Sequence, residues 1–224
     1  MHLVSEPPIL YFGTPVVLVS TVNEDGSVNL APISSVFWLG WRCMIGISAF
    51  SKTTANLLRT GECVLNLPSV NEVAAVDRLA LTTGSNPVPE GKRQKGYRHE
   101  KDKFRLSGLA PAPSLVVDPP RVLECPVQLE AVLMAKHPLA DEDPAQRNRL
   151  FSLELRIVKV HLSTEILMEG QANKVDPHKW RPLIMSFQKF YGLGAEVHPS
   201  RLSSIPESSY QMPDLVYARE AVNR

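Results

Sequence analysis

The stretch "SAFSKTTANLLRTGECVLNL", residues 48–67, predicts a short helix held between two β-strands. Ser51 is a suitable helix N-cap, and Leu57 lies on the apolar side of the predicted helix. Gly61 stands just past the end of the helix, where glycine is preferred. The last six residues read as a strand that Pro68 ends. What surrounds this unit decides the fold class.

Strand patterns dominate the chain on both sides of this helix. Short turns separate the first strands, and Asp25-Gly26 is a hairpin signal. Helices are few, which favours an antiparallel barrel or sandwich with peripheral helices over a parallel βαβ fold. The predicted strands cover residues 15–22, 28–40, 43–50, 62–67, 126–134 and 151–162.

The strand at 151–162 changes phase in its middle. Its apolar residues alternate up to Ile157 and then continue from Val158 on the other phase. One extra residue in a strand is typical of a β-bulge, which bends strands that close into barrels.

The remaining segments predict one domain over residues 1–224. An amphipathic helix is expected at 71–84, with Asn71 as N-cap and Gly84 at its end. The Pro-rich stretch 84–120 reads as a long surface loop, and 163–224 reads as an extended C-terminal segment.

Composition excludes several classes of function. A net charge of +1 gives no general attraction for nucleic acid, and no apolar run approaches the about 20 residues of a membrane helix. The N-terminus lacks the features of a signal peptide. Three widely spaced cysteines in apolar surroundings predict buried free thiols, and hence a reducing cytoplasm.

Common catalytic motifs are absent from the sequence. It contains no G-x-S-x-G, H-E-x-x-H, G-x-x-x-x-G-K-[ST] or C-x-x-C pattern. The six histidines are scattered without ligand spacing, so no metal site is expected.

The start of the helix in 48–67 is a candidate anion site. Free N–H groups and the helix dipole favour an anion there. Ser51 and Thr53 can add hydroxyl donors, Lys52 adds a charge, and Asn56 follows on the same face. The alternative is an ordinary helix that Ser51 caps, with Lys52 pointing to water.

Pro32 interrupts the strand-like run "NLAPISSVFW". The strand cannot be fully paired there, so its backbone groups and two serines could face a flat heteroaromatic ring. The alternative is a kinked edge strand without a ligand.

Four motifs in succession resemble the flavin-reductase-like family, whose domain is an FMN-binding split barrel. They are "STVNEDGSVNLAPISSVF", "ISAFSKTTANLLRTGECVLNLPS", "KFRLSGL" and "VLECPVQLEA", with weaker agreement at "RPLIMSFQKFYGLG". The resemblance implies a mainly β fold, a six-stranded antiparallel Greek-key barrel with a few peripheral helices. It also implies a homodimer with FMN bound near the subunit interface.

The resemblance also implies which residues hold the cofactor. The flavin contacts would be Asn29, Ala31, Pro32, Ser34 and Ser35. Lys52, Thr53 and Asn56 would bind the phosphate and ribityl groups, beside Ser51. A further aromatic element maps onto Tyr191, Leu193 and Gly194.

The expected function is that of an FMN-binding oxidoreductase. The flavin would take hydride from NAD(P)H, a transient co-substrate, and reduce free flavin, a small acceptor or a partner oxygenase. The alternatives are an electron carrier of flavoredoxin type and a split-barrel ligand-binding protein without redox turnover. Residues 91–104 hold six Lys or Arg against two acidic residues, and are a candidate lid for NAD(P)H or a solvated loop.

Overall fold

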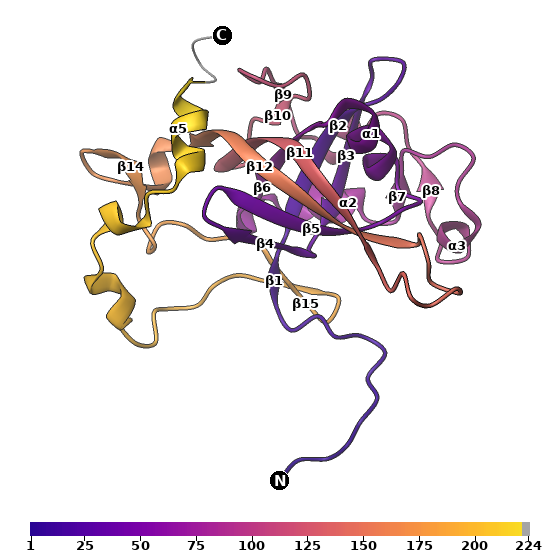
Figure 1. The fold of residues 1–224 in the computed structure, drawn as a ribbon, viewed down its shortest axis with the longest axis horizontal. Coiled ribbons are helices and arrows are strands. Elements are labelled where there is room, and N and C mark those ends of the chain that lie inside the picture. The colour runs from indigo at the N-terminus through magenta and orange to yellow at the C-terminus, as the bar shows by residue number, and fades with distance from the viewer. Residues whose placement is uncertain (221–224) are drawn as a thin grey trace.

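Seven strands form one antiparallel sheet in the computed structural model, which describes residues 1–220 (Figure 1). Their order across the sheet is β3-β2-β6-β11-β12-β5-β4. The strands are β2 (Val17–Val22), β3 (Val28–Ile33), β4 (Val36–Leu39), β5 (Arg42–Ser48), β6 (Glu62–Leu67), β11 (Val127–Leu139) and β12 (Leu150–Leu162).

The two outermost strands of this sheet, β3 and β4, are neighbours in the chain. Only Ser34 and Ser35 separate them, so the sheet must curl until its first and last strands meet at these two residues. No ladder joins β3 to β4, which leaves the barrel split. The mainly β split-barrel prediction is confirmed. The sheet has seven strands rather than six because the run predicted over 28–40 breaks into two.

The bulge expected in the strand at 151–162 is present. The register between β11 and β12 shifts between Glu130 and Ala131, which leaves Val158 as an extra residue of β12. Ile157 therefore packs in the main core while Val158 belongs to a small separate cluster. The phase change in the sequence thus marks the bend of the barrel wall.

Both sides of the barrel wall are buried. Val17 and Val19 pack in the main core with residues of β5, β6, β11 and β12. Leu18 belongs to a second core with Leu30 and residues of the helices outside. Because side chains alternate along a strand, the three consecutive residues Val17 to Val19 of β2 are all apolar.

Helix α1 (Lys52–Thr60) has the bounds that the sequence predicts. The hydroxyl of Ser51 accepts a hydrogen bond from the N–H of Thr54 at 3.0 Å. Gly61 closes the helix at φ 74°, a conformation that glycine adopts without strain.

Helix α2 (Val73–Leu79) is shorter than the helix predicted at 71–84. A 3₁₀ turn precedes it, and the N-cap of that turn is Ser69 with Glu72 in a capping box, not Asn71. The helix ends at Leu79, well before Gly84, and Leu81 takes a positive φ of 54°.

The segment 84–120 contains short elements rather than only loop. Phe104 is buried in the second core, so part of the segment covers the barrel wall. Its helices are α3 (Glu90–Arg93) and α4 (Lys103–Ser107). Its short strands are β8 (Arg98–His99), which pairs with β7 (Thr82–Thr83) just before the segment, and β9 (Pro111–Ala112), which pairs with β10 (Arg121–Val122) just after it.

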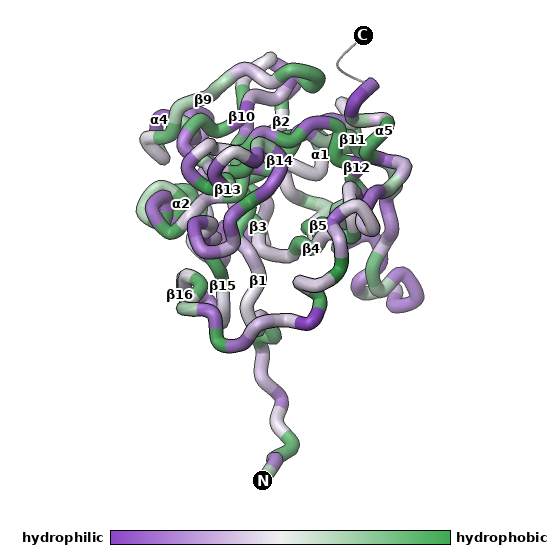
Figure 2. The backbone as a smooth tube through the Cα atoms, turned by 90° about the vertical axis from the view of Figure 1, so that its left-hand side faces the viewer, coloured by the Kyte–Doolittle hydropathy of each residue, from purple (hydrophilic) through white to green (hydrophobic). Residues whose placement is uncertain are grey.

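The C-terminal segment adds further small elements around the barrel. Helix α5 (Pro213–Glu220) lies against β12, while the N-terminal segment projects away from the body in both ribbon and tube views (Figures 1 and 2). The short strands of this segment are β13 (Leu167–Met168), β14 (Gln171–Val175), β15 (Ile184–Ser186) and β16 (Lys189–Tyr191), and β1 (Thr14–Pro15), near the N-terminus, pairs with β15. The 3₁₀ turns are Val70–Glu72, Thr164–Ile166, Arg201–Ser204 and Glu207–Tyr210. No helix among residues 1–220 combines the length and apolar character that crossing a membrane requires.

Three free cysteines are buried, as the sequence predicts. Burial raises the pKa of the Cys43 thiol to about 12 and raises that of Cys125 well above its usual value. These thiols are therefore protonated at neutral pH and act as core residues.

Candidate functional site

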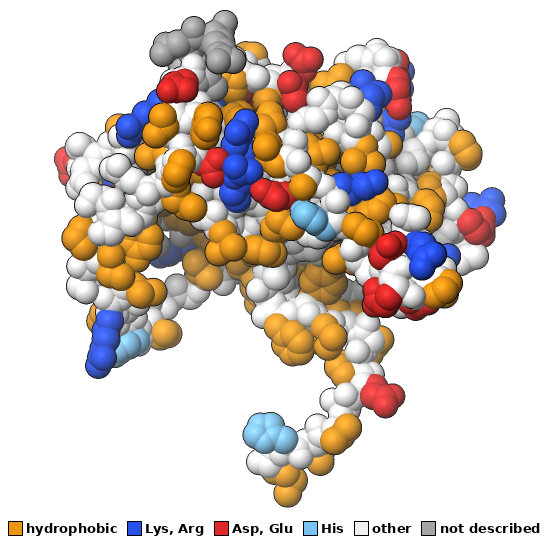
Figure 3. Space-filling model, in the orientation of Figure 1, with side chains coloured by type: hydrophobic (Ala, Val, Ile, Leu, Met, Phe, Trp, Pro, Cys, Tyr) orange, Lys and Arg blue, Asp and Glu red, His pale blue; other side chains and the backbone are white. Residues whose placement is uncertain are grey.

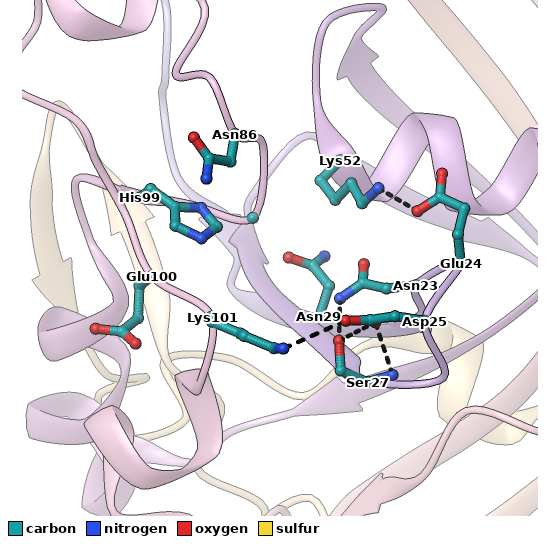
Figure 4. A pocket seen from close by; sticks show the side chains of 11 residues that line it. Asn23, Glu24, Asp25, Ser27, Asn29, Lys52, Asn86, His99, Glu100 and Lys101 are labelled. Carbon is teal, nitrogen blue, oxygen red and sulfur yellow. Dashed lines mark hydrogen bonds and ion pairs between the residues drawn. The ribbon is translucent and has the colours of Figure 1, made fainter.

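A cavity of about 320 Å³ lies where three separate parts of the chain meet (Figure 4). The parts are the turn between β2 and β3, the start of α1, and the two ends of segment 84–101. The parallel pairing of β7 with β8 holds those two ends together. The cavity walls include Glu24, Asp25, Asn29, Lys52, Gly84 and Lys101.

Lys52 is the cation at the helix start. Its Nζ lies 2.5 Å from Oε2 of Glu24, and its side chain is 21% exposed. This ion pair lowers the pKa of Glu24. Helix α1 has no acidic residue in its first turn, so the partner of Lys52 comes from a different element.

A second ion pair connects the same turn to the other wall. Nζ of Lys101 lies 3.4 Å from a carboxylate oxygen of Asp25. Asp25 also accepts hydrogen bonds from the hydroxyl and the N–H of Ser27. These bonds, the hydroxyl first, lower the pKa of Asp25 to about 2, so the turn carries two carboxylates at neutral pH.

Asn29 forms the floor of the cavity together with Gly84. Its Nδ2 donates to Oγ1 of Thr53 at 3.0 Å, and the residue is buried. Its Oδ1 is buried without a hydrogen-bond partner among the described residues. A Cβ added at Gly84 would lie 2.5 Å from that oxygen, so only glycine leaves it room. An unpaired buried acceptor is costly and indicates a missing donor.

Thr53 and Asn56 lie beneath the cavity rather than in its wall. Both are buried, and Nδ2 of Asn56 donates to Oγ1 of Thr21 at 3.0 Å and to Oδ1 of Asn23 at 2.8 Å. This network ties α1 to the hairpin of β2 and β3. It therefore fixes where Lys52 and Asn29 stand relative to one another.

The other predicted cofactor residues lie outside the cavity. Ala31 and Pro32 belong to β3, the outer strand of the sheet, and Ser34 with Ser35 form the break before β4. Tyr191 is in β16 and is 52% exposed.

Ser51 acts as the N-cap of α1, which was the plainer of the two interpretations of this helix start. A capping hydroxyl that already accepts from Thr54 keeps its own hydrogen available. It donates to, or accepts from, the Thr54 hydroxyl at 2.8 Å.

Several wall residues had no signal in the sequence. Asn86 and His99 face the cavity from segment 84–101 (Figure 4), and Glu24 and Asp25 read as parts of an ordinary turn. These residues come from two separate parts of the chain, so only the folded structure brings them together at one cavity.

The chain is similar to known proteins over most of its length. The model of the family described as "Flavin reductase like domain" matches residues 9–194. The chain is 36% identical over 192 residues to the uncharacterised protein YdfE of Bacillus subtilis (strain 168), covering 86% of this chain and 89% of that protein.

Solved structures share the fold. The flavoredoxin of Desulfovibrio vulgaris (Miyazaki F) superposes with a TM-score of 0.71 at 21% identity, covering 91% of this chain and 99% of that one. Nitrilotriacetate monooxygenase component B from Bacillus cereus has a TM-score of 0.67 at 20% identity, covering 84% and 88%. The chain therefore belongs to the flavin reductase like family, and flavin-related oxidoreductase chemistry comes with that membership.

Proposed function

We propose that the protein is an FMN-dependent NAD(P)H:flavin reductase. The observation that carries the proposal is the pairing of a cation with an unsatisfied acceptor in one cavity, namely Lys52 and Oδ1 of Asn29. The chemistry that a flavin supplies when bound is hydride acceptance at N5 from a nicotinamide, followed by electron transfer to an acceptor.

The cavity fits the phosphate end of FMN. Lys52 at the first turn of α1 offers a positive charge to a phosphate. Asn29 lies close by, because a Cβ added at Gly84 would meet both Asn29 and Lys52, and the unpaired Oδ1 of Asn29 can accept from a ribityl hydroxyl. Thr53 and Asn56 then support these ligands from below.

The outer strand β3 offers backbone groups that could bind the flavin ring system. It pairs on one side only, with β2, so its other edge keeps free backbone groups at Ala31 and Pro32, and Ser34 with Ser35 follow directly after the strand. A flat ring with polar edges can bond to such groups, and it needs no acid–base residue from the protein.

We propose that a second copy of the chain covers the face around the split. Hydrophobic side chains gather over β4 and at the base of the N-terminal segment (Figure 3). Phe12, Phe37 and Leu39 are 74%, 54% and 70% exposed. Apolar patches of this kind mark interaction surfaces, and here a homodimer would shield the edge of β3.

The basic segment 91–104 is proposed to attract NAD(P)H. Lys95 is exposed, while Lys92 is half-buried with Nζ 3.3 Å from Oγ1 of Thr83, near the cavity. Replacing Lys92, Arg93 and Lys95 by Ala should raise the KM for NAD(P)H at low salt. An unchanged KM would contradict this role of the segment.

An electron carrier is the second candidate function, because the flavoredoxin of D. vulgaris shares the fold over nearly the whole chain. Steady-state oxidation of NADH and NADPH separates the two, since a carrier turns over slowly without a protein partner. The electron acceptor of the reductase would be free flavin, another small molecule, or a partner oxygenase, as the name of the B. cereus protein suggests. The three free thiols agree with a cytoplasmic protein.

Flavin titration tests the proposed site directly. Quenching of flavin fluorescence should report binding of FMN, and Lys52→Met should weaken FMN binding by about tenfold, the factor that corresponds to about 1.4 kcal/mol. Riboflavin lacks the phosphate, so its affinity should be nearly the same in both proteins. Equal losses for FMN and riboflavin would refute the phosphate role of Lys52.

A further inference from the structure

The turn between β2 and β3 carries its charges toward the cavity. Glu24 and Asp25 each pair with a lysine from another element, Lys52 on α1 and Lys101 beyond β8 (Figure 4). The cations that would receive a phosphate are thus neutralised by carboxylates of the protein itself. A carboxylate and a phosphate compete for the same ammonium group because both offer anionic oxygens.

Lys52 has one carboxylate within ion-pair distance in residues 1–220, and that carboxylate is Glu24. The lysine stands at the start of α1, where the helix dipole opposes a cation and no acidic side chain of the first turn compensates it. Its side chain is 21% exposed, whereas that of Glu24 is 59% exposed. Lys52 is therefore held in the cavity wall, while the side chain of Glu24 lies mostly in solvent.

The turn does not depend on Glu24 for its shape. Asp25 accepts from Ser27, and Nδ2 of Asn23 donates to Oγ of Ser27 at 3.0 Å. Residues 23 and 26 are also joined by a backbone bond. Glu24 is thus free to leave Lys52 without disturbing the hairpin.

We propose that Glu24 is an internal competitor for the phosphate site, and that it holds Lys52 until a phosphate monoester displaces it. This inference rests on the proposed function, because the monoester in question is the phosphate of FMN. Asp25 acts in the same sense on Lys101, more weakly, since that pair is longer and its two side chains are 71% and 56% exposed.

The competition sets affinity and discriminates between ligands. A flavin without a phosphate has no anionic group that could replace the Glu24 carboxylate at Lys52. A dianionic phosphate can replace it, because it brings two negative charges to the lysine in place of the single charge of the carboxylate. The cost of displacement is modest because the pair is partly exposed to solvent. Removing the charge of Glu24 should therefore tighten binding of FMN by about three- to tenfold.

The test compares Glu24→Gln with a matched control. Asp141→Asn removes the same charge from a side chain that is 55% exposed and paired with Arg147, in the connection between β11 and β12, and Asp141 is not among the residues that line the cavity. Three ligands are titrated at low and at high salt, namely FMN, riboflavin and inorganic phosphate. Flavin binding is followed by fluorescence, and phosphate is measured both by calorimetry and as a competitor of FMN.

We expect Glu24→Gln to bind FMN and inorganic phosphate several-fold more tightly, with riboflavin unchanged and the gain reduced at high salt. Asp141→Asn should behave as the parent protein. Equal or weaker FMN binding by Glu24→Gln would overturn the inference, as would the same gain for riboflavin or the same gain in Asp141→Asn.

The outcome also separates this inference from the proposed function. If no variant binds flavin but Glu24→Gln binds inorganic phosphate more tightly than the parent protein, the reductase proposal fails and the competition stands. If flavin binds and Glu24→Gln changes nothing, the competition fails alone.

Discussion

Lys103→Met should make the protein more stable at neutral pH. Lys103 is 2% exposed, at the start of α4, and its side-chain amine has no hydrogen bond or ion pair to another described residue. Burial first, and the charge of Lys92 second, lower its pKa to about 8, while Glu100 acts weakly in the opposite direction. Methionine keeps the apolar stem of the side chain and removes the charge.

The size of the effect follows from this pKa. The gap between about 8 and the ordinary value of 10.5 corresponds to about 3 kcal/mol of unfolding free energy. Below pH 8 the amine is charged in the folded and unfolded states, so the full penalty is present. Between pH 8 and 10.5 the unfolded state binds more protons, and the parent protein gains stability as the pH rises.

Urea unfolding at pH 7 and at pH 10, at fixed protein concentration and without flavin, measures this difference. The free energy of unfolding of Lys103→Met should exceed that of the parent protein by about 3 kcal/mol at pH 7 and by clearly less at pH 10. Lys101→Met is the control, because that side chain is 71% exposed and should change stability by less than about 0.5 kcal/mol. A Lys103→Met protein no more stable than its parent at pH 7 would refute the reasoning.

Three further substitutions probe the site and the scaffold. Gly84→Ala should weaken FMN binding at least severalfold in a fluorescence titration, because its Cβ would press on Oδ1 of Asn29; an unchanged Kd would contradict the proposed cavity floor. Glu130→Ala should destabilise the fold by about 3 kcal/mol or more in urea unfolding, since this fully buried carboxylate accepts from two backbone N–H groups of segment 113–118 and contacts a histidine. A loss of unfolding free energy below about 1 kcal/mol would show that other acceptors satisfy these two N–H groups in the variant. Arg42→Met should leave global stability nearly unchanged but speed proteolysis near α5, because Arg42 binds Asp214 through two hydrogen bonds of 2.9 Å; equal cleavage rates would refute this anchoring role.

Local patterns were sufficient to predict several elements. Ser51 and Gly61 define α1 because capping depends on residues within one turn of the helix ends. The hairpin of β2 and β3 and the bulge at Val158 follow from turn chemistry and from a change of phase. In these cases the determining contacts lie within a few residues along the chain.

Predictions failed where long-range packing decides. The helix expected at 71–84 ends at Leu79, because the chain must turn there to pair β7 with β8. The strand expected at 126–134 runs on to Leu139, since β12 offers a partner along its whole length. Neither partner is visible in the local sequence.

The site was predictable in part for the same reason. Lys52 and Asn29 carry recognisable patterns, and both line the cavity. Glu24, Gly84 and His99 join them only because three distant segments meet, and a single glycine or turn acid has no distinguishing signal. That Ala31, Pro32, Ser34, Ser35 and Tyr191 contact a flavin stays a prediction.

We propose above that this protein holds FMN and reduces it with a nicotinamide. The most direct measurement is an absorbance spectrum after addition of FMN and gel filtration, repeated under anaerobic conditions with NADH or NADPH. We expect flavin absorbance that elutes with the protein and bleaches when the nicotinamide is added. Flavin that never elutes with the protein would contradict the proposed site, and bound flavin that neither nicotinamide bleaches would contradict the reductase function.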